Sequence, residues 1–118
     1  MTDIIYNLKN KCVTIKGHAQ SGEHGKDLIC AAVSTLTYTL AENISGYASE
    51  IEGIQTHIKL DEGDAKIVCT KCPPEFDKVI DLVFCTICTG FEKLAETYPE
   101  NVKYTLVRGI EKAKSKGL

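Results

Sequence analysis

The sequence predicts an α+β domain in which a small sheet of about five strands, mixed or antiparallel, carries two amphipathic helices on one face. Two kinds of hydrophobic spacing predict it. Apolar residues alternate with polar ones in short segments, and they recur at steps of three and four in two longer segments. The expected order is ββ-loop-α-ββ-α-β. The 118 residues are enough for one domain with its own core. We therefore expect a single domain over residues 1–110 and a frayed basic tail over residues 111–118.

The strands are predicted from period-two alternation. Ile4, Tyr6 and Leu8 alternate with polar residues, and Val13 and Ile15 do the same after a short polar turn. This pattern is typical of a hairpin. The remaining strands are expected near residues 54–60, 65–70 and 102–106, with a turn at residues 61–64.

The two helices are predicted from apolar stripes. The first is expected to begin at Leu28, with Asp27 as its N-cap and Gly46 near its end. The second is expected to start at Pro73-Pro74 and to end near Pro99. The stripes consist of Ile29, Val33, Leu36, Leu40, Ile44 and Tyr47 in the first helix, and of Phe76, Ile80, Val83, Ile87, Phe91 and Leu94 in the second.

The charge balance and the apolar runs exclude several classes of protein. Lys and Arg number 14 against 16 Asp and Glu, which gives a net charge of −2 and argues against binding nucleic acid by bulk charge. No apolar run reaches the roughly 18–20 residues of a membrane span. The first ten residues lack the basic start and apolar stretch of a secretory signal. We expect a cytoplasmic protein with no membrane and no direct nucleic-acid partner.

Six cysteines need an explanation, and four of them form two C-x₂-C pairs, Cys69 with Cys72 and Cys85 with Cys88. Such pairs are typical of zinc sites. Disulfides are not expected, because the thiols of cytosolic proteins are kept reduced. However, Cys85 and Cys88 fall inside the predicted second helix and Cys69 occupies a strand position. Packed thiols, with no metal and no cofactor, are therefore the favoured interpretation. A zinc-stabilised structural module and a redox role for Cys69 and Cys72 are the alternatives.

A polar segment with three glycines, residues 17–27, separates the first hairpin from the first helix. His18 opens this segment, and Cys30 lies in the first helical turn if Asp27 is the N-cap. Unpaired N–H groups and the helix dipole favour a thiolate there. They could also hold an oxyanion, and a histidine across the loop could complete a Cys–His dyad. The spacing alone also fits a core cysteine, and His24 could replace His18 as the base.

The motifs Gly17–Ala19 (Gly-His-Ala) and Asp27–Ser34 (Asp-Leu-Ile-Cys-Ala-Ala-Val-Ser) closely resemble those of the ribosomal-processing cysteine protease family, Prp. The resemblance covers nearly the whole chain. It implies that His18 and Cys30 are the catalytic pair. It also implies a cysteine endopeptidase, a homodimer, that removes a short phenylalanine-rich N-terminal extension from the twenty-seventh protein of the large ribosomal subunit. The four later cysteines are not part of the family's pattern.

Three further positions match residues that support the site in the family: Gly17, Asp27 and Ser34. From its place one turn after Cys30, Ser34 could donate to the sulfur or bond to its own backbone. Capping alone would also explain Asp27.

The segment from Ala19 to Lys26 is expected to close over an extended peptide, with Gly22, His24 and Gly25 as residues of this substrate loop. The alternative is a non-catalytic ribosome-associated module that contacts ribosomal RNA with its sheet and the Lys112–Lys116 tail. The negative net charge disfavours it.

Overall fold

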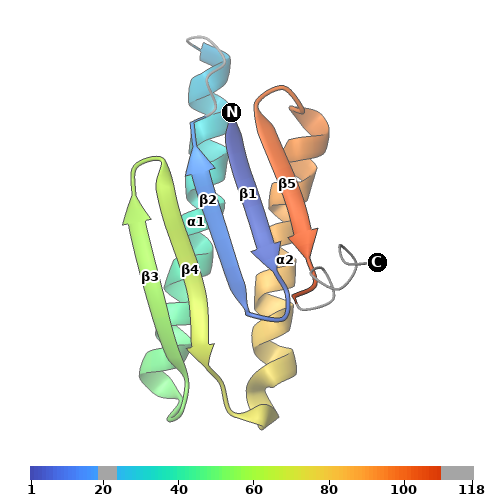
Figure 1. Cartoon of the computed structure of the whole chain (residues 1–118). Helices are drawn as coiled ribbons and strands as arrows, with labels where there is room; N and C mark the ends of the chain where they lie inside the picture. Colours follow the sequence, from blue (N-terminus) through green and yellow to red (C-terminus); the bar gives the residue numbers. More distant parts are fainter. Residues whose placement is uncertain (19–23, 110–118) are drawn as a thin grey trace.

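The chain forms a five-stranded mixed sheet with both long helices on one of its faces (Figure 1). The computed structural model describes residues 1–18 and 24–109, except for the side chains of residues 24–27, and the predicted basic tail lies outside these residues. The predicted α+β class and element order are confirmed. The elements are β1 (Thr2–Asn7), β2 (Cys12–Gly17), α1 (His24–Glu50), β3 (Gln55–Asp61), β4 (Asp64–Lys71), the 3₁₀ turn η1 (Pro74–Phe76), α2 (Asp77–Thr97) and β5 (Val102–Val107).

The strand order is β3-β4-β2-β1-β5, so the first strand lies inside the sheet. Strand β1 pairs antiparallel with β2 and parallel with β5. Strand β4 pairs antiparallel with both β2 and β3. The parallel pair arises because α2 carries the chain back to the end of the sheet at which β1 begins (Figure 1).

The core lies between the sheet and the two helices. Alternate strand residues, including Ile4, Tyr6, Val13 and Ile67, are almost fully buried beneath the helices. The stripe predicted for α1 is confirmed, with Ile29, Val33, Leu40 and Ile44 buried and Leu36 and Tyr47 packed at the edge. Helix α1 continues to Glu50, one turn beyond the end expected at Gly46.

The buried face of α2 differs from the predicted stripe. Its fully buried residues are Ile80, Phe84, Cys88 and Phe91, whereas the predicted Val83 and Ile87 are only partly buried. The large ring of Phe84 decides the rotation, because it stacks on Tyr6 with ring centroids 5.7 Å apart and planes within 4°. Burial of such a ring stabilises the fold by about 1.5–3 kcal/mol.

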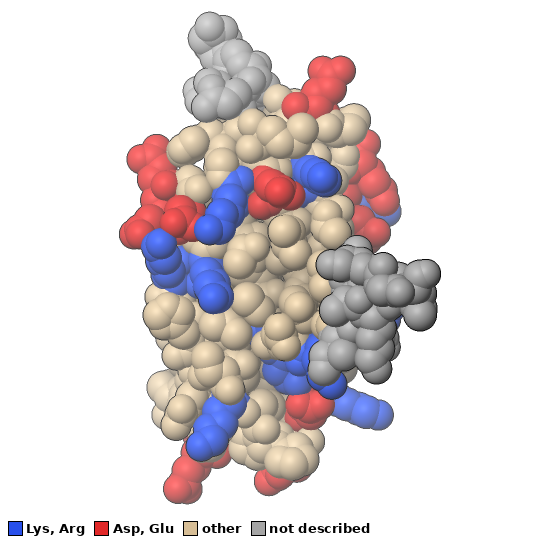
Figure 2. Space-filling model, in the orientation of Figure 1, with Lys and Arg blue, Asp and Glu red and all other residues tan. Residues whose placement is uncertain are grey.

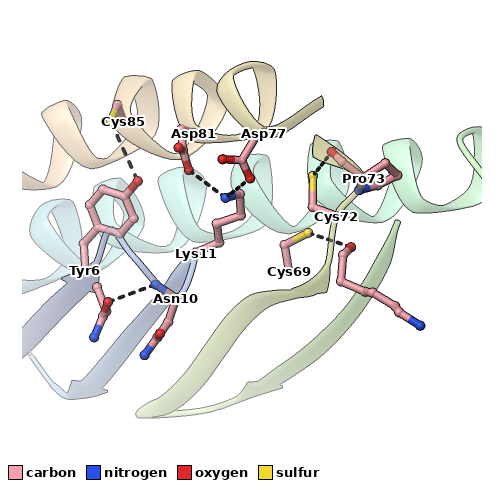
Figure 3. Close-up of polar contacts among 11 residues, drawn as sticks. Tyr6, Asn10, Lys11, Cys69, Cys72, Pro73, Asp77, Asp81 and Cys85 are labelled. Atoms are coloured by element: carbon pink, nitrogen blue, oxygen red, sulfur yellow. Dashed lines mark hydrogen bonds and ion pairs between the residues drawn. The ribbon is translucent and has the colours of Figure 1, made fainter. Parts of the chain in front are cut away.

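The end of the sheet that holds the β1–β2 turn is closed by polar contacts (Figure 3). Lys11 Nζ lies 2.6 Å from Asp77 Oδ1 and 3.4 Å from Asp81 Oδ1, both on α2. The Lys11 side chain is only 11% exposed. The Tyr6 hydroxyl lies 3.7 Å from Cys85 Sγ. These contacts hold the first half of α2 against the first hairpin.

Over the described part of the chain, neither long helix combines the length and the apolar character that a bilayer crossing requires.

Candidate active site

A cavity of about 410 Å³ opens at the other end of the sheet, where β2 ends and α1 begins. Its walls come from the start of β1, the last residues of β2, the second to fourth turns of α1 and the turn between β3 and β4. Figure 1 shows these segments grouped at the end of the molecule that also holds the N-terminus. His18, Cys30 and Ser34 all line this cavity.

His18 is exposed and directly follows β2. The preceding Gly17 has φ +92, a backbone conformation that residues with a Cβ rarely adopt. A Cβ at Gly17 would collide with the carbonyl oxygen of Met1. The Gly17 N–H donates to the Gly63 carbonyl oxygen over 2.9 Å. Only glycine therefore fits the position that carries the chain from β2 to His18.

Cys30 is half-buried on the side of α1 that faces the sheet. The prediction that Asp27 caps this helix is wrong, because α1 begins at His24 and Asp27 is a residue of its first turn. The N–H groups of a first helical turn have no acceptor within the helix, and its side chains can remain outside the core. Polar residues before Asp27 can therefore form this turn. The unpaired N–H groups belong to residues 24–27, and the Cys30 N–H donates within the helix.

The substrate loop predicted for residues 19–26 overlaps the start of α1. His24 and Gly25 belong to α1, so the expectation that the loop extends to Lys26 is wrong. Gly22 lies outside the described residues. Ser34 is exposed on α1, one turn beyond Cys30.

Two apolar side chains flank the cavity and remain accessible. Tyr38 on α1 is 55% exposed and Leu60 on β3 is 40% exposed, although residues of this size are usually covered. They offer an apolar contact surface to a side chain that enters the cavity.

Charged residues at the rim hold the β3–β4 turn to β2. Asp64 lies 2.7 Å from Lys59 Nζ and 3.3 Å from Lys16 Nζ. The hydrogen bonds from these two ammonium groups hold the pKa of the Asp64 carboxyl below its usual value. Asp64 therefore remains ionised at neutral pH and keeps the turn paired with β2.

The later cysteines do not converge on a metal. Among residues 1–18 and 24–109, no group of three or more His, Cys, Asp or Glu side chains could hold an ion. Cys69 and Cys88 are buried, as the packed-thiol interpretation predicts. Cys72 is half-buried, and Cys85 is exposed, so the interpretation is wrong for Cys85. Burial raises the pKa of the Cys88 thiol to about 12.

The face of the sheet that the helices leave open carries Lys and Arg side chains interspersed with Asp and Glu around an uncharged centre (Figure 2). Among the residues that the structure describes, this face has no continuous basic stripe of the kind that binds RNA.

Several residues that line the cavity lie outside the two sequence motifs and were not predicted, among them Tyr38, Leu60 and Gly63. The turn at residues 61–64 was predicted, but its place beside His18 depends on the pairing of β4 with β2. Alternation within single strands carries no signal for that pairing.

The model of the family described as "Cysteine protease Prp" matches residues 1–103, which contain every element that lines the cavity. The chain belongs to the Prp family. It is thus a cysteine protease of the ribosomal-processing type.

Individual proteins are similar to this chain over most of its length. The ribosomal processing cysteine protease Prp of Staphylococcus aureus (strain Mu50) is 27% identical over 103 residues, which are 86% of this chain and 92% of the relative. A crystal structure of Prp from S. aureus with a covalently linked product peptide aligns with TM-score 0.66 and 26% identity, covering 89% of this chain and 96% of that one. The crystal structure of SMU.848 from Streptococcus mutans aligns with TM-score 0.70 and 31% identity, covering 91% and 92%.

Proposed function

We propose that this Prp-family protein is an endopeptidase that uses Cys30 as nucleophile and His18 as general base. The observation that carries the proposal is that both side chains line one cavity although they come from different elements, a strand end and a helix. The cavity is large enough for an amino-acid side chain, and it is open at the surface for an extended peptide.

In the proposed mechanism, His18 accepts the proton of the Cys30 thiol, and the thiolate attacks the carbonyl carbon of the scissile peptide bond. The tetrahedral intermediate collapses as His18 protonates the leaving amine, which leaves an acyl group on Cys30. His18 then removes a proton from water, and the hydroxide releases the acyl group as a carboxylate. We assign the stabilisation of the oxyanion to the unpaired N–H groups of residues 24–27, at the start of α1.

The proposed substrate is the phenylalanine-rich N-terminal extension of the twenty-seventh protein of the large ribosomal subunit. Two findings support a peptide substrate of this kind. The exposed Tyr38 and Leu60 provide apolar contacts for an aromatic side chain at the cavity. A crystal structure of Prp from S. aureus in complex with a substrate peptide aligns with TM-score 0.65, at 25% identity over 89% of this chain and 96% of that one.

The direct test is to incubate the protein with a peptide that spans such an extension and to read the product masses. We expect one cleavage by the parent protein and none by Cys30→Ala. The matched control is Cys85→Ala, because Cys85 is exposed on α2 away from the cavity, and it should cleave at the parent rate. Cleavage by Cys30→Ala would remove Cys30 from the nucleophile role.

Supporting roles for Gly17, Asp27 and Ser34, a cytoplasmic location and a homodimer belong to the same proposal. Ser34→Ala should lower the rate of cleavage without loss of fold, since Ser34 is exposed at the cavity. Light scattering coupled to size exclusion should give twice the chain mass of 12.9 kDa. A single-chain mass at the concentrations that support cleavage would show that the monomer is the active form.

A further inference from the structure

The turn between β3 and β4 lies directly against the imidazole of His18. Gly63, in this turn, has φ +71. A Cβ built on Gly63 would lie 2.6 Å from His18 Nε2, 3.0 Å from Cε1 and 3.3 Å from Cδ2. Real Cβ atoms do not approach to 2.6 Å. The ring therefore occupies space that exists only because residue 63 has no side chain, and Nε2 is the closest ring atom.

The same turn also holds the backbone just before His18. The Gly63 carbonyl oxygen accepts a hydrogen bond of 2.9 Å from the Gly17 N–H. Beside it, Asp64 pairs with Lys16 across the β2–β4 ladder, and their side chains form an ion pair of 3.3 Å. The turn thus has a fixed position relative to β2, so a side chain added at residue 63 would displace the imidazole rather than the turn.

We propose that Gly63 is a positioning residue for His18, and that its missing side chain places the imidazole at the cavity. This inference rests on the proposed Cys–His pair. Proton transfer requires the acceptor nitrogen within hydrogen-bond reach of the thiol, and a displacement of about 1 Å can reduce the rate about 100-fold. Gly63 also lines the cavity, but in this scheme it takes no part in the reaction and acts through the position of His18.

The first experiment compares steady-state cleavage by Gly63→Ala and Gly63→Asn. Asparagine tolerates a left-handed backbone far better than alanine, but both residues bring the Cβ. We expect kcat to fall about 10- to 100-fold in both variants, with KM changed less than about threefold. Recovery of kcat in Gly63→Asn would attribute the loss to backbone strain and overturn the proposal.

Gly53→Ala is the matched control for strain. Gly53 also has a positive φ, +96, and a Cβ there would lie 2.9 Å from Pro73 Cγ, away from the cavity. This variant should lose stability and keep the parent kcat. A kcat loss in Gly53→Ala equal to that in Gly63→Ala would show that any strained turn impairs the enzyme, which would overturn the specific role of Gly63.

The second experiment measures the alkylation of Cys30 by iodoacetamide from acidic to alkaline pH, with each cysteine resolved by mass spectrometry. It uses the parent, His18→Ala, Gly63→Ala and the double variant. We expect Gly63→Ala to slow alkylation near neutral pH and to shift its pH profile toward that of His18→Ala, with no additional effect in the double variant. Circular dichroism verifies that all four proteins are folded.

The outcomes separate the two proposals. If His18→Ala leaves both alkylation and cleavage unchanged, the Cys–His pair fails and the role of Gly63 fails with it. If His18→Ala slows both reactions but Gly63→Ala slows neither, only the inference about Gly63 is overturned. Equal slowing by Gly63→Ala in the presence and absence of His18 would also overturn it, because the effect would then not pass through the imidazole.

Discussion

The two ends of the sheet carry similar chemical groups in opposite arrangements. At the end with the β1–β2 turn, Lys11 is enclosed by two carboxylates of α2, and the thiols of Cys69 and Cys72 donate to backbone carbonyl oxygens over 3.4 and 3.5 Å (Figure 3). At the other end, His18 and Cys30 line an open cavity. Polar groups at the closed end stabilise the fold, whereas those at the open end are accessible to a substrate.

The comparison shows why the number of cysteines is a poor guide to the reactive one. Burial raises the pKa of the Cys69, Cys72 and Cys88 thiols, which keeps them protonated near neutral pH. Cys30 differs from them in position, because it shares a cavity with a histidine.

The largest effect is expected when one cysteine at each end of the sheet is replaced by alanine and the two variants are compared. Cys30→Ala should reduce kcat/KM at least about 1,000-fold, because no other described thiol lines the cavity. Cys72→Ala should leave kcat/KM within about twofold of the parent value, since Cys72 lies at the closed end. Peptide cleavage followed by mass spectrometry measures both. A large loss in Cys72→Ala would break the comparison and implicate the closed end in catalysis.

A smaller effect, on stability alone, is expected for Lys11→Met. It keeps most of the apolar stem but removes the ammonium that lies 2.6 Å from Asp77 and 3.4 Å from Asp81. The free energy of unfolding should fall by about 1–3 kcal/mol, because the carboxylates lose a partly buried partner. Urea unfolding measures this change. Unchanged stability would show that the closed end is not held by these ion pairs.

A third expectation concerns alkaline pH. Burial raises the pKa of the Cys88 thiol from an ordinary 9.0 to about 12, so the folded state keeps a proton that the unfolded state loses above pH 9.0. This thiol therefore does not reduce the free energy of unfolding below pH 9.0. Above that pH the free energy of unfolding declines, by up to about 1.4 kcal/mol per pH unit for this one group. Cys88→Ala should flatten the decline, measured by urea unfolding at several pH values, with Cys85→Ala as the control. An equally steep decline in Cys88→Ala would contradict burial as its cause.

The smallest effect is expected at the open end, for Lys59→Met. The Lys59 side chain is 45% exposed and pairs with Asp64, whose side chain is 39% exposed. Solvent and salt screen such pairs, so the melting temperature should not change measurably. A clear drop in the melting temperature would show that ion pairs stabilise the rim of the cavity as they stabilise the closed end. The position of the β3–β4 turn would then depend on Lys59.

The sequence predicted the type and order of the elements, because alternation and helical stripes are local signals. It did not predict that β1 lies between β2 and β5, since pairing between distant strands leaves no trace in one sequence. The face of α2 was misjudged at Phe84, whose burial depends on Tyr6, a partner far away in the chain.

At the candidate site, His18 and Cys30 could be proposed because each lies in a short motif and the two motifs are close together in the sequence. The start of α1 at His24 was missed, since residues of a first helical turn obey weak preferences and Asp27 had the appearance of a cap. The contact between Gly63 and His18 was also beyond reach, because two strand pairings must be known before those residues can be placed together.

The parallel pairing of β5 with β1 has a consequence for the synthesis of this protein on a ribosome. Chains emerge with the N-terminus first. One edge of β1 therefore remains unpaired until residues 102–107 have emerged from the ribosome. All the strands that line the cavity emerge before these residues. Open strand edges pair readily with other chains. The strands that line the cavity can thus pair before β5 covers the open edge of β1.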